Sequence, residues 1–142
     1  MWDLRDDSEA VKVKSATRSA GITSFLSYKE NVLLVGGYDD NLCSYDLRNL
    51  RQPTDELNLK GGVWRIKPSA HHPDHFIVAC MYHNFSIANY SPESNLKLVG
   101  EYFGHDSICY GCDWSSKTTD DFNFFATCSF YDHKLDICKI KI

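Results

Sequence analysis

The sequence has no run of apolar residues long enough to cross a lipid bilayer. Its longest apolar stretch, Phe76 to Tyr82, is far shorter than the roughly 20 residues that a membrane-spanning helix needs. The first residues, Met1 to Asp7, are mostly charged or polar and contain no apolar core, so we expect no secretory signal peptide. An excess of basic charge is also missing, since the net charge is -4. We therefore expect a soluble, cytoplasmic protein with no membrane partner and no direct nucleic-acid partner.

The short motifs that mark several enzyme classes are absent as well. The chain contains no G-x-S-x-G elbow, no phosphate-binding P-loop and no H-E-x-x-H zinc motif. It also has no useful stretch with helical periodicity. Taken alone, these absences favour an all-β interaction module.

Six cysteines are present, and we expect reduced thiols that pack as small apolar groups. Cys109 and Cys112 form one C-x-x-C, and a single pair is a weak zinc signal. On a regular strand, residues three apart point to opposite faces, so these two thiols are not expected to share a metal. The histidines His71, His72 and His75 lie in a loop and are expected to be solvated. The sequence thus predicts neither a metal nor a cofactor.

A strand-turn-strand pattern recurs three times along the chain. When the copies are aligned, Leu42, Phe85 and Leu135 occupy one column, at spacings of 43 and 50 residues. The dipeptide Trp2-Asp3 precedes Tyr45-Asp46 by 43 residues and so marks the same column one repeat earlier. A period of roughly 40–45 residues with Gly-His and Trp-Asp signatures is typical of WD-type propeller blades.

The best preserved signature is the pair Gly104-His105, which precedes Asp132 by 27 residues counted from His105. In such a blade, His105 and Asp132 are expected to hydrogen-bond each other and to tie the loop to the turn. Asp39 occupies a similar turn in the first repeat. We therefore assign these three residues structural roles, with a catalytic pair as the weaker alternative for His105 and Asp132.

Alternation and turn residues predict four strands in each repeat, in the order d-a-b-c. The d strands are expected near 9–14, 55–59 and 96–102, and the a strands near 22–27, 63–67 and 109–114. The b strands are expected near 32–36, 75–80 and 124–129, and the c strands near 41–46, 85–89 and 134–140. A loop is expected at 115–121.

This pattern predicts an all-β, partial WD-repeat β-propeller with about three four-stranded blades in an open arc. The blades are expected at about 8–46, 55–90 and 96–142, with residues 1–7 ending a preceding blade. Propellers have about 4–8 blades, so we expect the C-terminal part of a longer propeller protein or a truncated product. The last c strand would then lack a d partner. Unpaired edges and exposed blade faces predict poor solubility or self-association.

In a d-a-b-c blade, the d-a and b-c loops meet at one end of the ring. Aromatic and basic side chains gather in the segments expected there: Tyr38, Trp64, Arg65, Tyr82, His83, Tyr110, Tyr131 and His133. For Trp64 and Tyr110, packing at the rim of the channel is the alternative to ligand contact.

Five stretches of the chain are more specific than a Trp-Asp dipeptide. They are Gly36 to Asp40, Asp46 to Asn49, Lys60 to Arg65, Tyr110 to Trp114 and Ala126 to His133. Together they resemble the C-terminal half of the WD-repeat diphthine methyl ester hydrolases, enzymes of diphthamide biosynthesis. The resemblance spans nearly all of the chain. The departures are a missing Gly-His near residues 19–20, a cysteine in place of the tryptophan at 138, and a shorter insertion at 115–123.

The resemblance implies a carboxylic ester hydrolase that acts on a modified protein. Such an enzyme removes the methyl ester from over-methylated diphthine on translation elongation factor 2 and exposes the carboxylate for later amidation. The substrate side chain also carries a trimethylammonium group. The alternative is a non-catalytic WD-repeat scaffold for protein interactions.

A quaternary ammonium has no N–H to donate and is best held by aromatic faces. Under the resemblance we expect Trp64, Tyr110 and Tyr131 to bind the substrate. Ester hydrolysis needs a base or nucleophile and an electropositive group for the oxyanion. The catalytic candidates are His133 and His83, which can titrate near neutral pH, and Arg65 for the negative charge. The sequence identifies no nucleophile.

Overall fold

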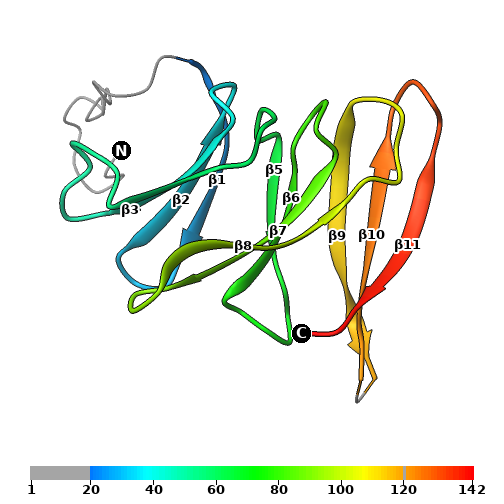
Figure 1. The fold of residues 1–142 in the computed structure, drawn as a ribbon. Helices are drawn as coiled ribbons and strands as arrows, with labels where there is room; N and C mark the ends of the chain where they lie inside the picture. The colour runs from blue at the N-terminus through cyan, green and yellow to red at the C-terminus, as the bar shows by residue number, and fades with distance from the viewer. Residues whose placement is uncertain (1–19, 120) are drawn as a thin grey trace, which may run out of the picture.

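The structure, a computed structural model, describes residues 20–119 and 121–142. Within these residues every regular element is a β-strand, and no helix occurs. The strands form three antiparallel sheets that stand side by side in an open arc (Figure 1). The expected all-β arrangement of blades is thus confirmed. The d strand expected at 9–14 lies outside the described residues.

The described strands fall close to their predicted positions. The first sheet contains β1 (Ile22–Tyr28), β2 (Val32–Gly37), β3 (Asn41–Asp46) and β4 (Asp55–Asn58). The second contains β5 (Arg65–Pro68), β6 (His75–Ala79), β7 (Phe85–Ser91) and β8 (Asn95–Tyr102). The third contains β9 (Cys109–Thr118), β10 (Asn123–Ser129) and β11 (Leu135–Ile140). In the part of the chain described, no helix is long and apolar enough to cross a membrane.

The hydrogen-bonded sheets are offset by one strand from the sequence repeat. Leu57 of β4 pairs with Leu42 of β3, and Tyr102 of β8 pairs with Phe85 of β7. Each d strand therefore completes the sheet formed by the a, b and c strands before it. In the third described sheet, β11 is the outer strand, and β10 is its partner among the described strands.

Two apolar layers hold the three sheets together. The layer between the first and second sheets is built from large buried side chains: Tyr28, Leu34, Leu42, Leu59, Val63, Ile66, Phe76, Val78, Tyr90 and Leu96. The layer between the second and third sheets contains Ile77, Ala79, Phe85, Ile87, Cys109, Cys112 and Phe125. Burial of these side chains drives the docking of neighbouring blades, because the hydrophobic gain scales with the apolar area removed from water.

Two glycines permit close packing around the start of the second blade. A Cβ atom at Gly36 would lie 2.1 Å from Cγ1 of Val63, and one at Gly61 would lie 2.2 Å from the carbonyl oxygen of Cys80. Real Cβ atoms do not approach other atoms so closely, so a side chain at Gly36 would push the first two blades apart, and one at Gly61 would push the segment before β5 away from the turn after β6. This explains glycine at both positions, which fall within the stretches Gly36 to Asp40 and Lys60 to Arg65.

The loop expected at 115–121 is wrong in its first half. Strand β9 continues to Thr118, which pairs with Asn123 at the start of β10. The amide of Thr119 then donates to the carbonyl of Phe122 at 3.0 Å and closes a tight turn. Serine and threonine suggested a loop, but the cross-strand partner supplied by β10 extends the strand.

The expectation that Cys109 and Cys112 face opposite sides of their strand is also wrong. A register irregularity in β9 lets Ser129 pair with Cys109, while Cys128 pairs with Gly111. Such a bulge shifts the alternation by one residue. Both thiols therefore enter the same buried layer. Burial raises the pKa of the Cys109 thiol to about 12, which keeps it protonated.

Candidate functional site

Five aromatic rings form a row along the edge of the three sheets that holds the turns after β2, β6 and β10. These turns lie at the upper edge of the ribbon in Figure 1. We call this edge the site end; it comprises the turns after β2, β6 and β10, the segments that precede β5 and β9, and the starts of those two strands. The row runs in order through Tyr38, Trp64, Tyr110, Phe130 and Tyr131, with centroid distances of 6.4, 5.3, 6.1 and 5.1 Å. Each contact is edge-to-face, the arrangement that aromatic pairs favour.

The row contains all three predicted substrate-binding residues, but only two of them are in direct contact. Trp64 and Tyr110 touch directly, with ring planes at 81°. Tyr131 is separated from Tyr110 by Phe130, a ring that the sequence reasoning did not single out. The available signal was its place next to Tyr131 in the stretch Ala126 to His133. A shallow hollow of about 460 Å³ opens beside these rings and is lined by Tyr110, Cys128, Ser129, Phe130 and Tyr131.

Main-chain hydrogen bonds fix the spacing of the blades at this end. The amide of Val63 donates to the carbonyl of Gly37 at 2.9 Å and links the second sheet to the first. The amide of Cys109 donates to the carbonyl of Met81 at 3.0 Å and links the third sheet to the second. The starts of β5 and β9 are therefore held against the turns of the preceding blades.

The three catalytic candidates lie in different surroundings. His83, in the turn after β6, contacts Glu101 of β8, with Nε2 2.7 Å from Oε1. This bond, helped by the charge of Lys60 at 3.7 Å, lowers the pKa of Glu101 below its ordinary value. Arg65 is exposed at the start of β5, and His133 is exposed in the turn after β10. Among the described residues no hydrogen bond or ion pair joins these three candidates to one another.

His133 occupies a left-handed position in its turn, with φ of 51°. Asp40 takes the corresponding position in the first repeat, with φ of 62°, and both follow an acidic residue, Asp132 or Asp39. Asp39 lies half-buried in the turn between β2 and β3. Because Tyr131 then corresponds to Tyr38, the two turns present an aromatic, an acid and a left-handed residue in the same order.

The predicted direct bond between His105 and Asp132 is wrong, because Ser129 lies between them. Nδ1 of His105 lies 2.5 Å from the hydroxyl of Ser129, and that hydroxyl donates to Asp132. On the other side of the ring, Nε2 lies 2.9 Å from the hydroxyl of Thr127. The amide of Asp106 donates to the second oxygen of Asp132 at 3.0 Å.

These contacts assign the state of the imidazole. Because the one proton of Ser129 goes to Asp132, the Nδ1–H of His105 must donate to Ser129, and Nε2 accepts from Thr127. Burial lowers the pKa of His105, which favours this neutral form. The ring is fully enclosed, with a side chain 0% exposed, so it serves as a structural link between loop and turn.

The three loop histidines, which were expected to be solvated, make contacts with other residues. His71 contacts the carbonyl of Ser116 at 3.0 Å, and His75 contacts the carboxylate of Asp74 at 2.9 Å. The ring of His72 packs edge-to-face against that of His75 at 5.9 Å. No group of three potential metal ligands converges in the part of the chain described. These histidines therefore stabilise the end of the blades opposite the site end.

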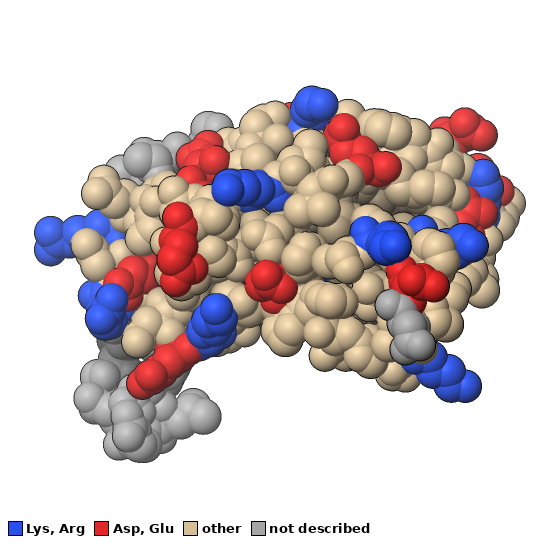
Figure 2. Space-filling view, turned by 60° about the horizontal axis from the view of Figure 1, so that its bottom comes forward, with Lys and Arg blue, Asp and Glu red and all other residues tan. Residues whose placement is uncertain are grey.

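The charged side chains form no broad field of one sign on the face shown in Figure 2. There, lysine and arginine lie interspersed with aspartate and glutamate among uncharged residues. Because this view turns the lower edge of Figure 1 forward, the mixed charges that it shows belong to the side opposite the site end.

Comparison with known proteins gives a consistent set of relatives. No protein-family model matches the chain. It is 41% identical over 129 residues to the "Diphthine methyltransferase homolog" of Dictyostelium discoideum, covering 82% of this chain and 35% of that protein. It is 34% identical over 162 residues to the "Diphthine methyltransferase" of Saccharomyces cerevisiae, covering 94% and 40%. For the Homo sapiens protein of that name the identity is 32% over 120 residues, covering 80% and 26%.

The chain thus spans between 26% and 40% of the length of these three relatives. Among solved structures, it superposes with a TM-score of 0.76 on a chain from the crystal structure of a mitotic checkpoint complex. That match has 17% sequence identity and covers 99% of this chain and 43% of the other. The fold is that of a WD-repeat β-propeller, present here as an arc of blades.

Proposed function

We propose that this chain, which is related to the proteins named diphthine methyltransferase, forms part of a carboxylic ester hydrolase of diphthamide biosynthesis. Its substrate would be methylated diphthine on translation elongation factor 2. Water would attack the ester carbonyl, the bond from that carbon to the methoxy oxygen would break, and methanol and the diphthine carboxylate would leave. The observation that carries the proposal is the 32–41% identity to these relatives across most of the chain.

The aromatic row supports the binding of such a substrate. Trp64, Tyr110 and Tyr131 lie along one edge, beside a hollow of about 460 Å³. Aromatic faces attract a quaternary ammonium through their quadrupole. Tyr131 is the most open of the three, with 68% of its surface exposed. Tyr131 would therefore be the ring most accessible to the modified side chain.

Of the two candidate bases, His83 has the stronger support. Its Nε2 contacts Glu101, and a histidine oriented by a carboxylate is a recurring arrangement for accepting a proton from water. Because the pKa of Glu101 is lowered, this carboxylate is ionised at neutral pH and stabilises the imidazolium that forms. His133 remains the second candidate, exposed two residues after Tyr131. Arg65, exposed beside Trp64, would stabilise the oxyanion.

A non-catalytic scaffold is the second candidate function. The observation that favours it is the number of exposed aromatic side chains at the site end, where Tyr82, Phe103, Phe130 and Tyr131 are each more than half exposed. Such residues are enriched at protein–protein contacts. Both candidates predict binding to the modified elongation factor, and they differ in turnover.

The test is an assay of the chain with methylated elongation factor 2, with the Saccharomyces cerevisiae relative as a reference. We expect release of methanol and appearance of a free carboxylate, followed by mass spectrometry of the diphthine peptide. The assay also offers unmethylated diphthine with a methyl donor, so that methyl addition can be detected. Binding without methanol release, while the reference releases it, would support the scaffold. Methyl addition would overturn the hydrolytic direction.

A further inference from the structure

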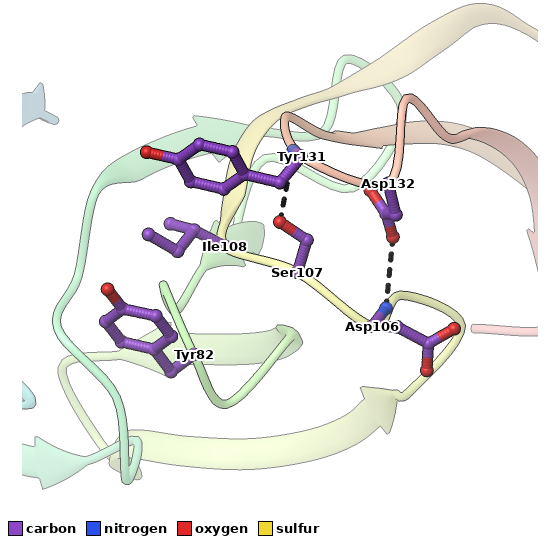
Figure 3. Close-up of a pocket in the computed structure, with 6 residues that line it drawn as sticks. All are labelled: Tyr82, Asp106, Ser107, Ile108, Tyr131 and Asp132. Atoms are coloured by element: carbon purple, nitrogen blue, oxygen red, sulfur yellow. Dashed lines mark hydrogen bonds between the residues drawn. The ribbon is translucent and has the colours of Figure 1, made fainter.

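A second hollow at the site end, of about 430 Å³, has a wall chemistry unlike that of the aromatic row (Figure 3). It is lined by Tyr82, Asp106, Ser107, Ile108, Tyr131 and Asp132. Tyr82 comes from the turn after β6, Tyr131 and Asp132 come from the turn after β10, and the other three form the loop before β9. The hollow therefore lies where segments of two neighbouring blades meet.

Hydrogen bonds fix two of these segments to each other. The amide of Tyr131 donates to the hydroxyl of Ser107 at 3.1 Å, and the amide of Asp106 donates to Asp132 at 3.0 Å. Both bonds are visible in Figure 3. Because they hold the walls in place without a ligand, binding would cost little ordering of the loops.

The two tyrosines supply exposed aromatic surface. Tyr82 is 80% exposed and Tyr131 is 68% exposed. In Figure 3 their rings extend to the same side of the hollow, with the side chain of Ile108 between them. Two rings and an isoleucine offer apolar contact on one side of a ligand, and the rings offer negative faces to a cation.

The two aspartates supply negative charge on the other side. The hydroxyl of Ser129 donates to Asp132 and lowers the pKa of that carboxyl, so it is ionised at neutral pH. Asp106 is exposed, and none of the six lining residues is basic. Both oxygens of Asp132 already accept a hydrogen bond, from Ser129 and from Asp106. The hollow thus combines negative charge with apolar and aromatic walls, a combination that suits a cation with apolar substituents, such as a quaternary ammonium.

We propose that this hollow binds a quaternary ammonium group against the faces of Tyr82 and Tyr131, with Asp106 and Asp132 supplying the countercharge. The assignment of that group to the substrate rests on the proposed function. On that assignment, the trimethylammonium of diphthine enters this hollow and leaves Trp64 and Tyr110, which pack against each other, to contact the rest of the substrate.

The binding test uses the whole chain, choline, and the uncharged isostere of choline in which carbon replaces nitrogen. Each is titrated while the amide resonances of Tyr131 and Asp106 are followed by NMR. We expect choline to shift both resonances and the isostere to bind at least about fivefold more weakly. Equal binding of the two compounds would overturn the proposal, because the hollow would then select for shape alone.

Variants locate the cation. Tyr82→Ala and Asp106→Asn are each expected to weaken choline binding by about fivefold, whereas Tyr82→Phe keeps the ring and the affinity. Phe25→Ala is the matched control, because Phe25 is 73% exposed on β1 and does not line the hollow. If Trp64→Ala abolishes choline binding while Tyr82→Ala leaves it intact, the cation sits in the aromatic row and the proposal is wrong.

The outcome is separable from that of the proposed function. If choline binds in the hollow but no methanol is released, the proposed cation site stands and the proposed hydrolase activity is wrong. If Tyr82→Ala and Asp106→Asn release methanol with an unchanged KM, the proposed hydrolase activity stands and the proposed cation site is wrong.

Discussion

The hydroxyl of Tyr102 donates a hydrogen bond of 2.7 Å to Asp136 and thereby joins the second sheet to the edge strand of the third. Tyr102 ends β8, and Asp136 lies near the start of β11. Lys134 contributes a second contact to the same carboxylate at 3.5 Å. Because β11 has β10 as its one strand partner in the described sheet, this side-chain bond is a second attachment for the edge strand.

Replacing Tyr102 with phenylalanine should lower the melting temperature in a pH-dependent way. The bond from Tyr102 is the main cause that lowers the pKa of Asp136 below its ordinary 3.8. A lowered folded-state pKa contributes stability that is present above the unfolded-state pKa and is lost as pH falls through the folded-state pKa. The difference between wild type and Tyr102→Phe should therefore be full at pH 7 and shrink below about pH 4. Thermal melts across this range measure it, with exposed Tyr38→Phe as the control; a constant difference would contradict the assignment.

Removing the hydroxyl of Tyr28 should have the opposite effect. This hydroxyl is buried between the first two sheets and has no hydrogen-bond partner among the described residues. A buried polar group without a partner costs about 1–3 kcal/mol. Tyr28→Phe keeps the ring contacts with Phe76 and Tyr90, so we expect a gain of about 1 kcal/mol in the free energy of unfolding. Denaturant titration would measure it, and a loss of stability would show that the hydroxyl does have a partner.

Gly36→Ala should destabilise the contact between the first and second blades by about 1–3 kcal/mol, because the new methyl group would overlap Val63. Gly100→Ala is the matched control within a strand, since its methyl would lie 4.0 Å from the nearest side-chain atom, in Ile140. Combining Gly36→Ala with Val63→Ala should cost less than the sum of the two single changes. Additive losses in denaturant titrations would argue against direct overlap.

The choice of base is open to a kinetic test. If His83 takes the proton from water, His83→Ala should lower kcat by about a hundredfold or more with little change in KM. Glu101→Gln should lower kcat less and shift the pH profile, because it removes only the orienting carboxylate. The same measurement on His133→Ala decides between the candidates: a large loss there, with full turnover in His83→Ala, assigns the base to His133. Thermal melts confirm that each variant is folded.

The outer face of the third sheet should drive self-association. Leu135 and Ile137 are 67% and 77% exposed on β11, at alternating positions that face the same side. Exposed apolar sheet faces and unpaired edges favour association. We expect oligomers by analytical ultracentrifugation, and a shift towards monomer in the double variant Leu135→Thr and Ile137→Thr. Lys139→Thr, on the same face, is the control. A monomeric wild-type chain would refute this expectation.

Much of the fold could be predicted because each blade carries its own pattern. The apolar residues of β2, β3 and β10 and the turn residues that flank these strands predict their positions within a few residues. The extension of β9 to Thr118 could not be predicted, because it depends on pairing with Asn123 rather than on local preference. The burial of Cys109 and Cys112 in the same layer could not be predicted either, because the C-x-x-C spacing does not indicate a β-bulge.

The candidate site was predicted only at the level of its location. The spacing of the repeats predicted that Trp64, Tyr110 and Tyr131 lie at the same end of the blades, and the structure places them in one row. Which rings touch depends on the backbone conformation of each turn. Met81 and His133 adopt left-handed conformations, and the sequence does not indicate this because neither residue is glycine. For the same reason, the spacing of His105 and Asp132 could not predict that Ser129 lies between them and hydrogen-bonds to both.

The main-chain links between blades have a consequence for how this edge can change over evolution. The bonds from Val63 to Gly37 and from Cys109 to Met81 use only backbone atoms, so most substitutions of the flanking side chains leave them intact. Proline at position 63 or 109 is the exception, because it removes the donor. The exposed rings of the site end can therefore be exchanged for other side chains while the register between blades persists. Ligand preference at this edge is thus free to diverge without a cost to the architecture.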